Sequence, residues 1–185
     1  FKINFKSSED FEFLKAKKFE SYSLIEELMV LANSIIGNFL KSNKVRSLFR
    51  NHEKPSNEKI SNLKKIVNDN NIKFSGNFHN QRGFNDFLKK IKKNEKLNFF
   101  NEVLLRSQSK AYYNEKNKGH FGLSIDDYVH FTSPIRRYSD LVVHRNLVSA
   151  YFNNKIKKYI DISDHLNVQE KKADMIERKI MERVS

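Results

Sequence analysis

The chain has 185 residues, contains no cysteine and no tryptophan, and has only two prolines and five glycines. Without cysteine, disulfide bonds, thiolate catalysis and zinc sites built on cysteine are excluded, and the composition suits a reducing cytosol. We find no apolar run of about eighteen residues that could cross a bilayer, and no signal peptide. We therefore expect a monomeric protein of the cytoplasm with no membrane partner.

Acidic residues are the scarcer charge, with 22 Asp and Glu against 35 Lys and Arg, which leaves a net charge of +13. A basic excess of this size is typical of proteins that bind RNA or DNA. It is mostly lysine and comes with many asparagines and isoleucines, the bias that an AT-rich genome gives to any protein. A solvated basic surface explains the charge equally well, and adhesion to anionic membranes is a weaker alternative.

Hydrophobic residues make up 38% of the chain and include sixteen phenylalanines, enough for the core of one domain or of a large piece of one. Apolar periodicity predicts short strands at residues 3–5 and 11–14, and a strand with a crossing loop within residues 119–132. It predicts helices over residues 21–41, 57–67, 84–91, 97–112 and 133–151, and from 162 to the end. The expected fold class is α+β, mostly helical. Because the chain begins at Phe1 and stops within a helical pattern, both ends look cut.

The first predicted helix carries an apolar stripe at three- and four-residue spacing, which predicts a face packed against the core. The stripe consists of Leu24, Leu28, Leu31, Ile35 and Phe39. Glu26 and Asn33 lie seven residues apart on another face. They either face solvent or contact sugar hydroxyls, and the residues alone favour solvent.

The most informative stretch is His-Phe-Thr-Ser-Pro-Ile-Arg-Arg-Tyr at residues 130–138. Thr132 or Ser133 can cap a helix, and the proline that follows suits its first position. Arg136 and Arg137 would then lie beside free backbone N–H groups, where each cation is disfavoured by roughly 0.3–1 kcal/mol. A bound phosphate would reverse that preference, because it accepts hydrogen bonds from guanidinium and N–H groups alike. The alternative is that Arg137 pairs with an acid and Arg136 is solvated.

Residues around this motif extend the predicted phosphate site. Asp140 lies four residues after Arg136 and can hold its guanidinium, while His144 and Arg145 extend a basic face of the same helix. Three side chains before the helix can offer stacking surfaces and hydrogen-bond donors to unpaired bases, namely His120, Tyr128 and His130. For each histidine, a structural role satisfied by backbone is the commoner explanation.

These stretches resemble the C-terminal half of the RNB catalytic domain of the RNase II/RNase R exoribonucleases, and RNase R is the closer branch. The most specific block runs from residues 119–123 through 130–138 to 140–145. Supporting matches lie at residues 25–33, 50–55, 104–107 and 170–174. The likeness makes residues 1–185 a partial RNB domain. One departure is Ser139, which stands where RNase R proteins usually have proline, and we expect little effect from it.

The resemblance implies hydrolysis of single-stranded RNA, from 3′ to 5′, to nucleoside 5′-monophosphates. The Mg²⁺ it implies would be held by aspartates of the first half of the domain, which would precede Phe1. No metal ligand is expected in this chain. The adjacent Asp126 and Asp127 do not form a metal pair, because neighbouring residues of a strand point to opposite faces.

The resemblance also assigns roles by motif match. Arg136 matches the catalytic arginine that stabilises charge on the scissile phosphate. Glu26 or Glu27 falls where a family glutamate contacts the 3′-terminal nucleotide, and Glu177 is a possible further match. The candidate RNA-binding residues are Glu26, Glu27, His120, Tyr128, His130, Thr132, Ser133, Arg137, His144 and Arg145.

The expected partners are single-stranded RNA, the missing N-terminal half of the RNB domain, and flanking cold-shock and S1 domains. The competing hypothesis is a catalytically inactive RNA-binding remnant of an RNB domain. An isolated half-domain would expose apolar surface where its other half belongs. We therefore expect the purified chain to aggregate.

Overall fold

The computed structural model describes residues 2–5, 11–14, 19–92, 97, 99–152 and 162–184, and the chain divides into two compact units, Phe1–Ala32 and Asn33–Ser185. The first unit holds two antiparallel strands, β1 (Lys2–Phe5) and β2 (Phe11–Leu14). It also holds the start of helix α1 (Glu20–Ser42), which continues into the second unit. Both predicted strands and the first predicted helix are confirmed, as is the mostly helical α+β class.

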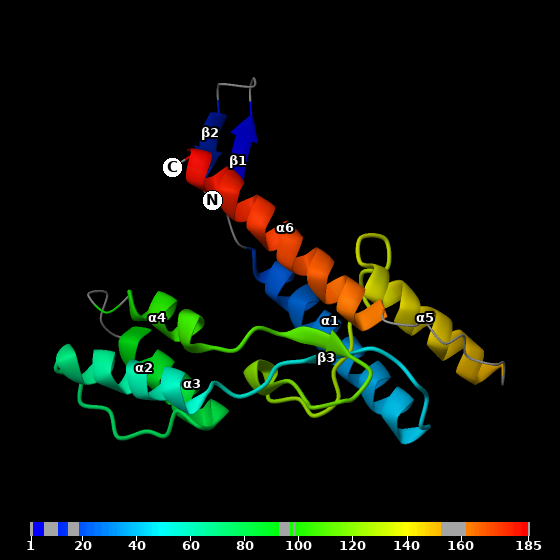
Figure 1. Ribbon diagram of the computed structural model, residues 1–185, viewed down its shortest axis with the longest axis horizontal. Helices are drawn as coiled ribbons and strands as arrows, with labels where there is room; N and C mark the ends of the chain where they lie inside the picture. The colour runs from blue at the N-terminus through cyan, green and yellow to red at the C-terminus, as the bar shows by residue number, and fades with distance from the viewer. Residues whose placement is uncertain are drawn as a thin grey trace. The chain divides into compact units, whose positions relative to one another are not determined.

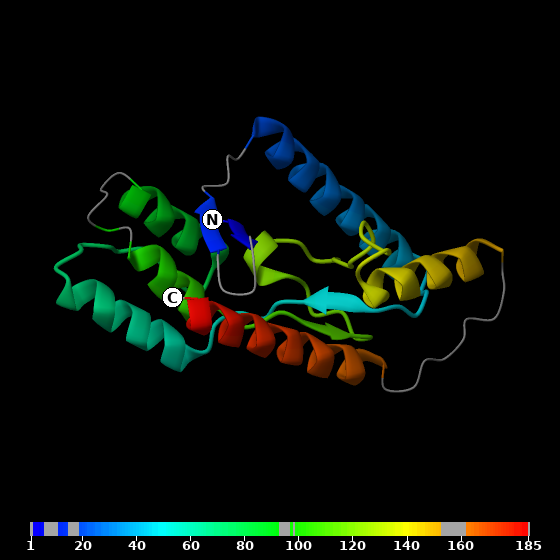
Figure 2. The ribbon, with the colours of Figure 1, turned by 90° about the horizontal axis from the view of Figure 1, so that it is seen from above.

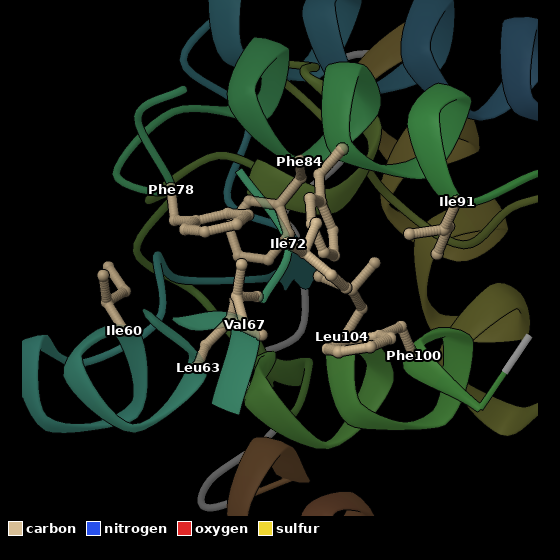
Figure 3. Packing of buried hydrophobic residues seen from close by; sticks show 10 residues of the cluster. Ile60, Leu63, Val67, Ile72, Phe78, Phe84, Ile91, Phe100 and Leu104 are labelled. Atoms are coloured by element: carbon tan, nitrogen blue, oxygen red, sulfur yellow. The ribbon is translucent and has the colours of Figure 1, made fainter. Parts of the chain in front are cut away.

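Three helices of the second unit, α2 (Asn57–Asp69), α3 (Gln81–Lys92) and α4 (Phe100–Ser107), enclose the largest hydrophobic core. Figure 1 shows these helices gathered together, and Figure 3 shows their apolar side chains pointing toward one another. The buried members are Ile60, Leu63, Val67, Ile72, Phe78, Phe84, Phe87, Ile91, Phe100 and Leu104. Several of the phenylalanine rings meet edge to face, the geometry that ring quadrupoles favour.

A short antiparallel ladder, β3 (Phe49–Asn51) with β4 (Tyr112–Asn114), joins segments far apart in the sequence (Figure 2). A smaller core lies where α1 ends, beside β3 and α5 (Tyr138–Tyr151). Its buried members are Leu40, Phe49, Val129 and Val143. This core holds the chain around Val129, and with it the 130–138 motif, against α1 and α5.

The last helix, α6 (Ile162–Val184), is attached to β4 by side chains. Asn167 accepts a hydrogen bond from the Tyr113 N–H at 2.8 Å and donates one to the Tyr113 carbonyl oxygen at 2.9 Å. Arg50 of β3 adds an ion pair with Glu170. The predicted last helix is confirmed, while its predicted end at Ser185 lies outside the described residues.

Two predicted helices are wrong in extent, and one predicted strand is absent. The helix expected over residues 97–112 is confined to α4, because Tyr112–Asn114 pairs with β3 instead. No strand forms within residues 119–132, all of which are described; the backbone there makes the 3-10 turn η2 (Phe121–Leu123). The helix expected from residue 133 begins only at Tyr138, because the preceding residues form a separate turn.

Helix α1 buries a different face from the predicted one. Its buried residues are Asn33, Gly37 and Leu40, whereas the apolar stripe is exposed, from 41% at Phe39 to 61% at Leu24. Gly37 sets the buried face, because a Cβ there would lie 2.7 Å from the carbonyl oxygen of residue 127, an approach that only glycine permits. By length and composition α1 also qualifies as a membrane span, contrary to the sequence expectation, although a core helix of a soluble protein passes the same test.

Candidate nucleic-acid interface

A short turn at residues 133–137 carries both arginines of the predicted site. The N–H groups of Arg136 and Arg137 donate to the carbonyl oxygen of Ser133 at 3.3 and 3.0 Å. Asp140, fully buried in the first turn of α5, accepts from the Ser133 N–H at 2.7 Å and from Arg137 Nη2 at 2.8 Å. The carboxylate therefore fixes both ends of the turn.

The two arginines differ in what they contact. The Arg137 side chain is 24% exposed and paired with Asp140. Arg136 is exposed, and its guanidinium has no partner among the residues that the structure describes. The prediction that Asp140 holds Arg136 is wrong, since α5 begins after the turn and the carboxylate meets Arg137 instead. Arg136 is thus the cation of this turn that is free to meet an anion.

Asn33 ties the start of the motif to α1. Its Oδ1 accepts from the N–H groups of Phe131 at 2.9 Å and Thr132 at 3.3 Å, and its Nδ2 donates to the Tyr128 hydroxyl at 3.1 Å. Asn33 is 3% exposed, so the interpretation that it faces solvent is wrong. Met29, Val30 and Ile36 lie one turn away from Asn33 on the helix. An asparagine with such apolar neighbours is the sequence signal that could have found it, because a buried amide needs partners.

A row of rings runs beside the motif. His52 and His120 lie 5.0 Å apart between ring centroids, His120 and Tyr128 5.1 Å, and Tyr128 and His130 5.9 Å. Tyr128 is 6% exposed, so it supports the two flanking imidazoles. The prediction that it offers a stacking face to bases is wrong. His120 and His130 are each partly exposed.

Two of these imidazoles are neutral at neutral pH. Burial, reinforced by Arg137 and Arg50, lowers the pKa of His130 to about 3. Burial, reinforced by His52 and Arg50, lowers the pKa of His120 to about 4. Neither adds positive charge to the interface, and each presents one donor and one acceptor nitrogen.

A cavity of about 680 Å³ opens beside His120. Its lining includes Lys54, Lys118 and Asp126, and Lys118 already donates to Glu53 at 2.7 Å. Because both signs of charge line it, the cavity does not favour an anion by its charge alone.

Two predicted residues of α5 hold or flank the motif. His144 stacks on Phe131 with ring centroids 4.0 Å apart, and its Nε2 donates to the Phe131 carbonyl oxygen at 2.8 Å. Arg145 is exposed and lies over the Tyr138 ring, 5.8 Å from its centroid. His144 is therefore a positioning residue, and Arg145 is a cation at the surface.

Most of the predicted site residues belong to the second unit, and the three predicted glutamates lie on helices α1 and α6. Glu26 and Glu27 are exposed on α1 in the first unit, and Glu177 is exposed on α6. Thr132 does not cap a helix: its Oγ1 is buried with no partner in the described part of the chain. Ser133 contributes its backbone N–H and carbonyl to the turn.

Carboxylates in the described ranges do not assemble into a metal site. The Asp127 carboxylate accepts hydrogen bonds from Lys41 Nζ at 2.6 Å and from Asn38 Nδ2 at 3.4 Å. No group of three or more histidines, cysteines and acids that could hold a metal ion occurs among the described residues. These residues therefore do not fit an Mg²⁺ site.

Comparison with protein families matches the RNB domain to residues 1–153, most of the chain. The chain belongs to the RNB domain family. Curated relatives of this RNB domain include Ribonuclease R of Buchnera aphidicola subsp. Schizaphis graminum, 35% identical over 173 residues, and that of Escherichia coli, 30% identical over 177 residues. The alignments cover 88% and 87% of the chain but 24% and 22% of the relatives. The chain thus spans about a quarter of their length.

Solved structures agree with this assignment. The RNB domain superposes on Mycoplasma genitalium RNase R in complex with ribose methylated single-stranded RNA, with a TM-score of 0.80 and 30% identity over 91% of this chain and 28% of that one. It shares its fold with yeast Ssd1, a pseudonuclease, at a TM-score of 0.70 and 23% identity over 82% of this chain and 20% of the other. The resemblance to the RNase R branch is confirmed.

Proposed function

We propose that this RNB domain segment serves a 3′-to-5′ exoribonuclease of the RNase R type, which hydrolyses single-stranded RNA to nucleoside 5′-monophosphates. The observation that carries the proposal is the exposed Arg136 on a turn whose two ends are fixed by the buried Asp140. The fixed turn sets where the Arg136 side chain leaves the backbone, and an arginine guanidinium can bind a phosphate through two hydrogen bonds. The names of the relatives, and the single-stranded RNA in one solved complex, support RNA as the substrate.

In this proposal Arg136 is the catalytic residue of the chain, and it stabilises charge on the scissile phosphate. Arg137 and Asp140 position the turn that carries it. His120 and His130 contact the RNA strand as neutral imidazoles. Cations bind the phosphates without regard to sugars and bases, so neutral groups are the ones that can recognise those parts. Glu26 or Glu27 contacts the 3′-terminal nucleotide.

Mg²⁺ would be held by aspartates outside the described residues, which do not fit a metal site. This chain would orient the RNA strand and, through Arg136, stabilise the negative charge of the scissile phosphate. The proposal also includes cold-shock and S1 domains as neighbours, a cytoplasmic location and a monomeric state of the whole protein.

The competing proposal is an RNA-binding remnant without catalysis. It keeps Arg136 and the row of rings as a binding surface, and it needs no metal ion. Binding of single-stranded RNA without release of nucleotides in Mg²⁺, by the protein as its gene encodes it, favours this alternative.

The RNA-binding surface is tested by the affinity of the chain for a fluorescent oligoadenylate at several salt concentrations. Arg136→Ala should weaken binding and lower the slope of log K against log salt by about 0.7, the value for one phosphate contact on a single strand. The matched control is Arg82→Ala on α3, whose side chain is 91% exposed and which removes the same charge. Equal losses in the two variants would mean that net charge, and not the turn, binds RNA.

A further inference from the structure

Three buried side chains and the partly exposed His130 form a series of hydrogen-bond contacts beside the arginine turn. Ser139 Oγ lies 3.1 Å from Asp140 Oδ2 and 3.1 Å from the phenol oxygen of Tyr113, which lies 2.8 Å from His130 Nδ1. Asp140, Ser139 and Tyr113 are 0%, 2% and 5% exposed. Water therefore does not donate hydrogen bonds to these three side chains, and the protons in their contacts belong to the side chains themselves.

The number of protons decides which group donates in each contact. Asp140, paired with the Arg137 guanidinium, is a carboxylate that only accepts, so the Ser139 hydroxyl must donate to it. Because Ser139 has a single proton, its contact with Tyr113 must use the phenol proton. The contact between Tyr113 and His130 is then left with one possible donor, the Nδ1–H of the imidazole.

The opposite arrangement leaves one contact without a proton. If Tyr113 donated to His130 Nδ1, the oxygens of Tyr113 and Ser139 would meet 3.1 Å apart with the serine proton already committed to Asp140. Burial raises the pKa of Tyr113, so the phenol keeps its proton at neutral pH. The lowered pKa of His130, about 3, leaves the ring with one proton, which must lie on Nδ1.

The second ring nitrogen of His130 is not used by the described part of the chain. His130 is partly exposed, and its Nε2 has no hydrogen-bond partner among the described residues. In the Nδ1–H form this nitrogen carries a lone pair, so it accepts hydrogen bonds and cannot donate one.

Resting on the proposed function, we propose that Asp140, Ser139 and Tyr113 fix His130 as its Nδ1–H tautomer, so that Nε2 accepts a hydrogen bond from a ribose 2′-hydroxyl of the bound RNA. The 2′-hydroxyl is the donor that every RNA nucleotide carries and DNA lacks. Acceptance by a fixed lone pair would therefore read the sugar without reading the sequence. Ser139 and Tyr113 act through His130 and are positioning residues.

The tautomer is measured on the full chain, free of RNA, by long-range ¹H–¹⁵N correlation of labelled histidines, with His130 assigned from its absence in His130→Gln. The expected pattern has the proton on Nδ1. In Ser139→Ala the phenol proton becomes free to donate to Nδ1, and the ring should change to its Nε2–H form. Ser107→Ala is the matched control, because that buried hydroxyl donates to the Leu104 carbonyl oxygen and should leave the tautomer unchanged. An Nε2–H ring in the wild-type chain would overturn the proposal.

Recognition of the sugar is measured at nanomolar protein by anisotropy with oligoadenylate and oligodeoxyadenylate of one length. Ser139→Ala and Tyr113→Phe should each weaken RNA binding about three- to tenfold, the worth of one neutral hydrogen bond, and should leave DNA binding within about twofold. Equal losses on RNA and DNA would overturn recognition of the sugar. A wild-type chain that shows the Nδ1–H ring but binds no RNA would refute the proposed function and sugar recognition, and would leave the proton order intact.

Discussion

Arg50 and Glu170, separated by 120 positions in the sequence, form a two-pronged ion pair with N–O distances of 2.7 and 2.9 Å. The Arg50 side chain is 13% exposed and also lies over the Tyr113 ring, 4.5 Å from its centroid. The pair joins β3 to α6 and places the guanidinium close enough to help lower the pKa of His130. One side chain therefore attaches a distant helix and adds to burial and Arg137 in lowering the pKa of His130.

Removing the anion should loosen α6. Glu170→Ala leaves a largely buried guanidinium without its partner, and we expect the free energy of unfolding to fall by about 1–2 kcal/mol. Urea unfolding measures the loss, and limited proteolysis should cut α6 first. Glu177→Ala, an exposed position of the same helix, is the control. Equal effects of the two substitutions would show that the ion pair does not hold the helix.

Gly37→Ala should destabilise the chain even though alanine is the better helix former. Helix propensity favours the substitution by about 1 kcal/mol, but the new Cβ would lie 2.7 Å from a backbone carbonyl oxygen. Backbone must move to relieve such a clash, so we expect a net loss of about 1–3 kcal/mol in urea unfolding. A gain in stability would mean that the chain near Asp127 can move away from α1 without loss.

The sequence predicts most elements of this fold because apolar spacing is a local signal. Ser56, directly before α2, caps that helix, its Oγ accepting from the Lys59 N–H at 3.3 Å. Pairing of Tyr112–Asn114 with β3 is a contact between distant residues, and no local pattern predicts it. The start of the helix at residue 133 was predicted wrongly because it depends on a side-chain contact. Pro134 favours a helix start, but Asp140 accepts from the Ser133 N–H, and the helix begins only at Tyr138.

The candidate site could be predicted from the sequence only in part. Arg136 was identified because its residue type and motif are visible in the printed chain, and the structure leaves it exposed. Asn33, Ser139 and Tyr113 were missed as members of the site, since their role lies in hydrogen bonds across 98, 26 and 17 positions. Buried polar contacts of this kind depend on the fold and leave no local pattern.

Acid should destabilise the chain through its buried imidazoles. The pKa values of His120 and His130 are lowered to about 4 and about 3 in the folded chain, below the usual 6.5 that we expect on unfolding. Their contribution to stability is therefore complete above about pH 6.5 and is lost as the pH falls toward 4 and 3. His130→Gln should reduce the slope of unfolding free energy against pH by about 1 kcal/mol per pH unit between pH 4 and 6.

Urea unfolding at each pH measures that slope. His79→Gln, at an exposed position, is the matched control and should leave the slope as it is in the wild type. An unchanged slope in His130→Gln would show that His130 is not held neutral in the folded chain.

The exposed stripe of α1 should make the purified chain associate. Leu28, Leu31 and Ile35 are 51–57% exposed on one helix, an apolar strip of the kind that drives contact between molecules. Leu31→Lys with Ile35→Lys should lower light scattering at high concentration. Leu105→Lys on α4, at a side chain 74% exposed, adds charge elsewhere and should help less. A wild-type chain that stays monomeric would contradict this prediction.

The central claim, that Arg136 meets the scissile phosphate, is tested most directly by the turnover of single-stranded RNA in a protein that carries the complete RNB domain. Arg136→Ala should lower kcat by about 10²–10³, the usual loss when a preorganised charge stabiliser is removed. Arg82→Ala should leave kcat unchanged. Turnover of Arg136→Ala near the wild-type rate would contradict the account.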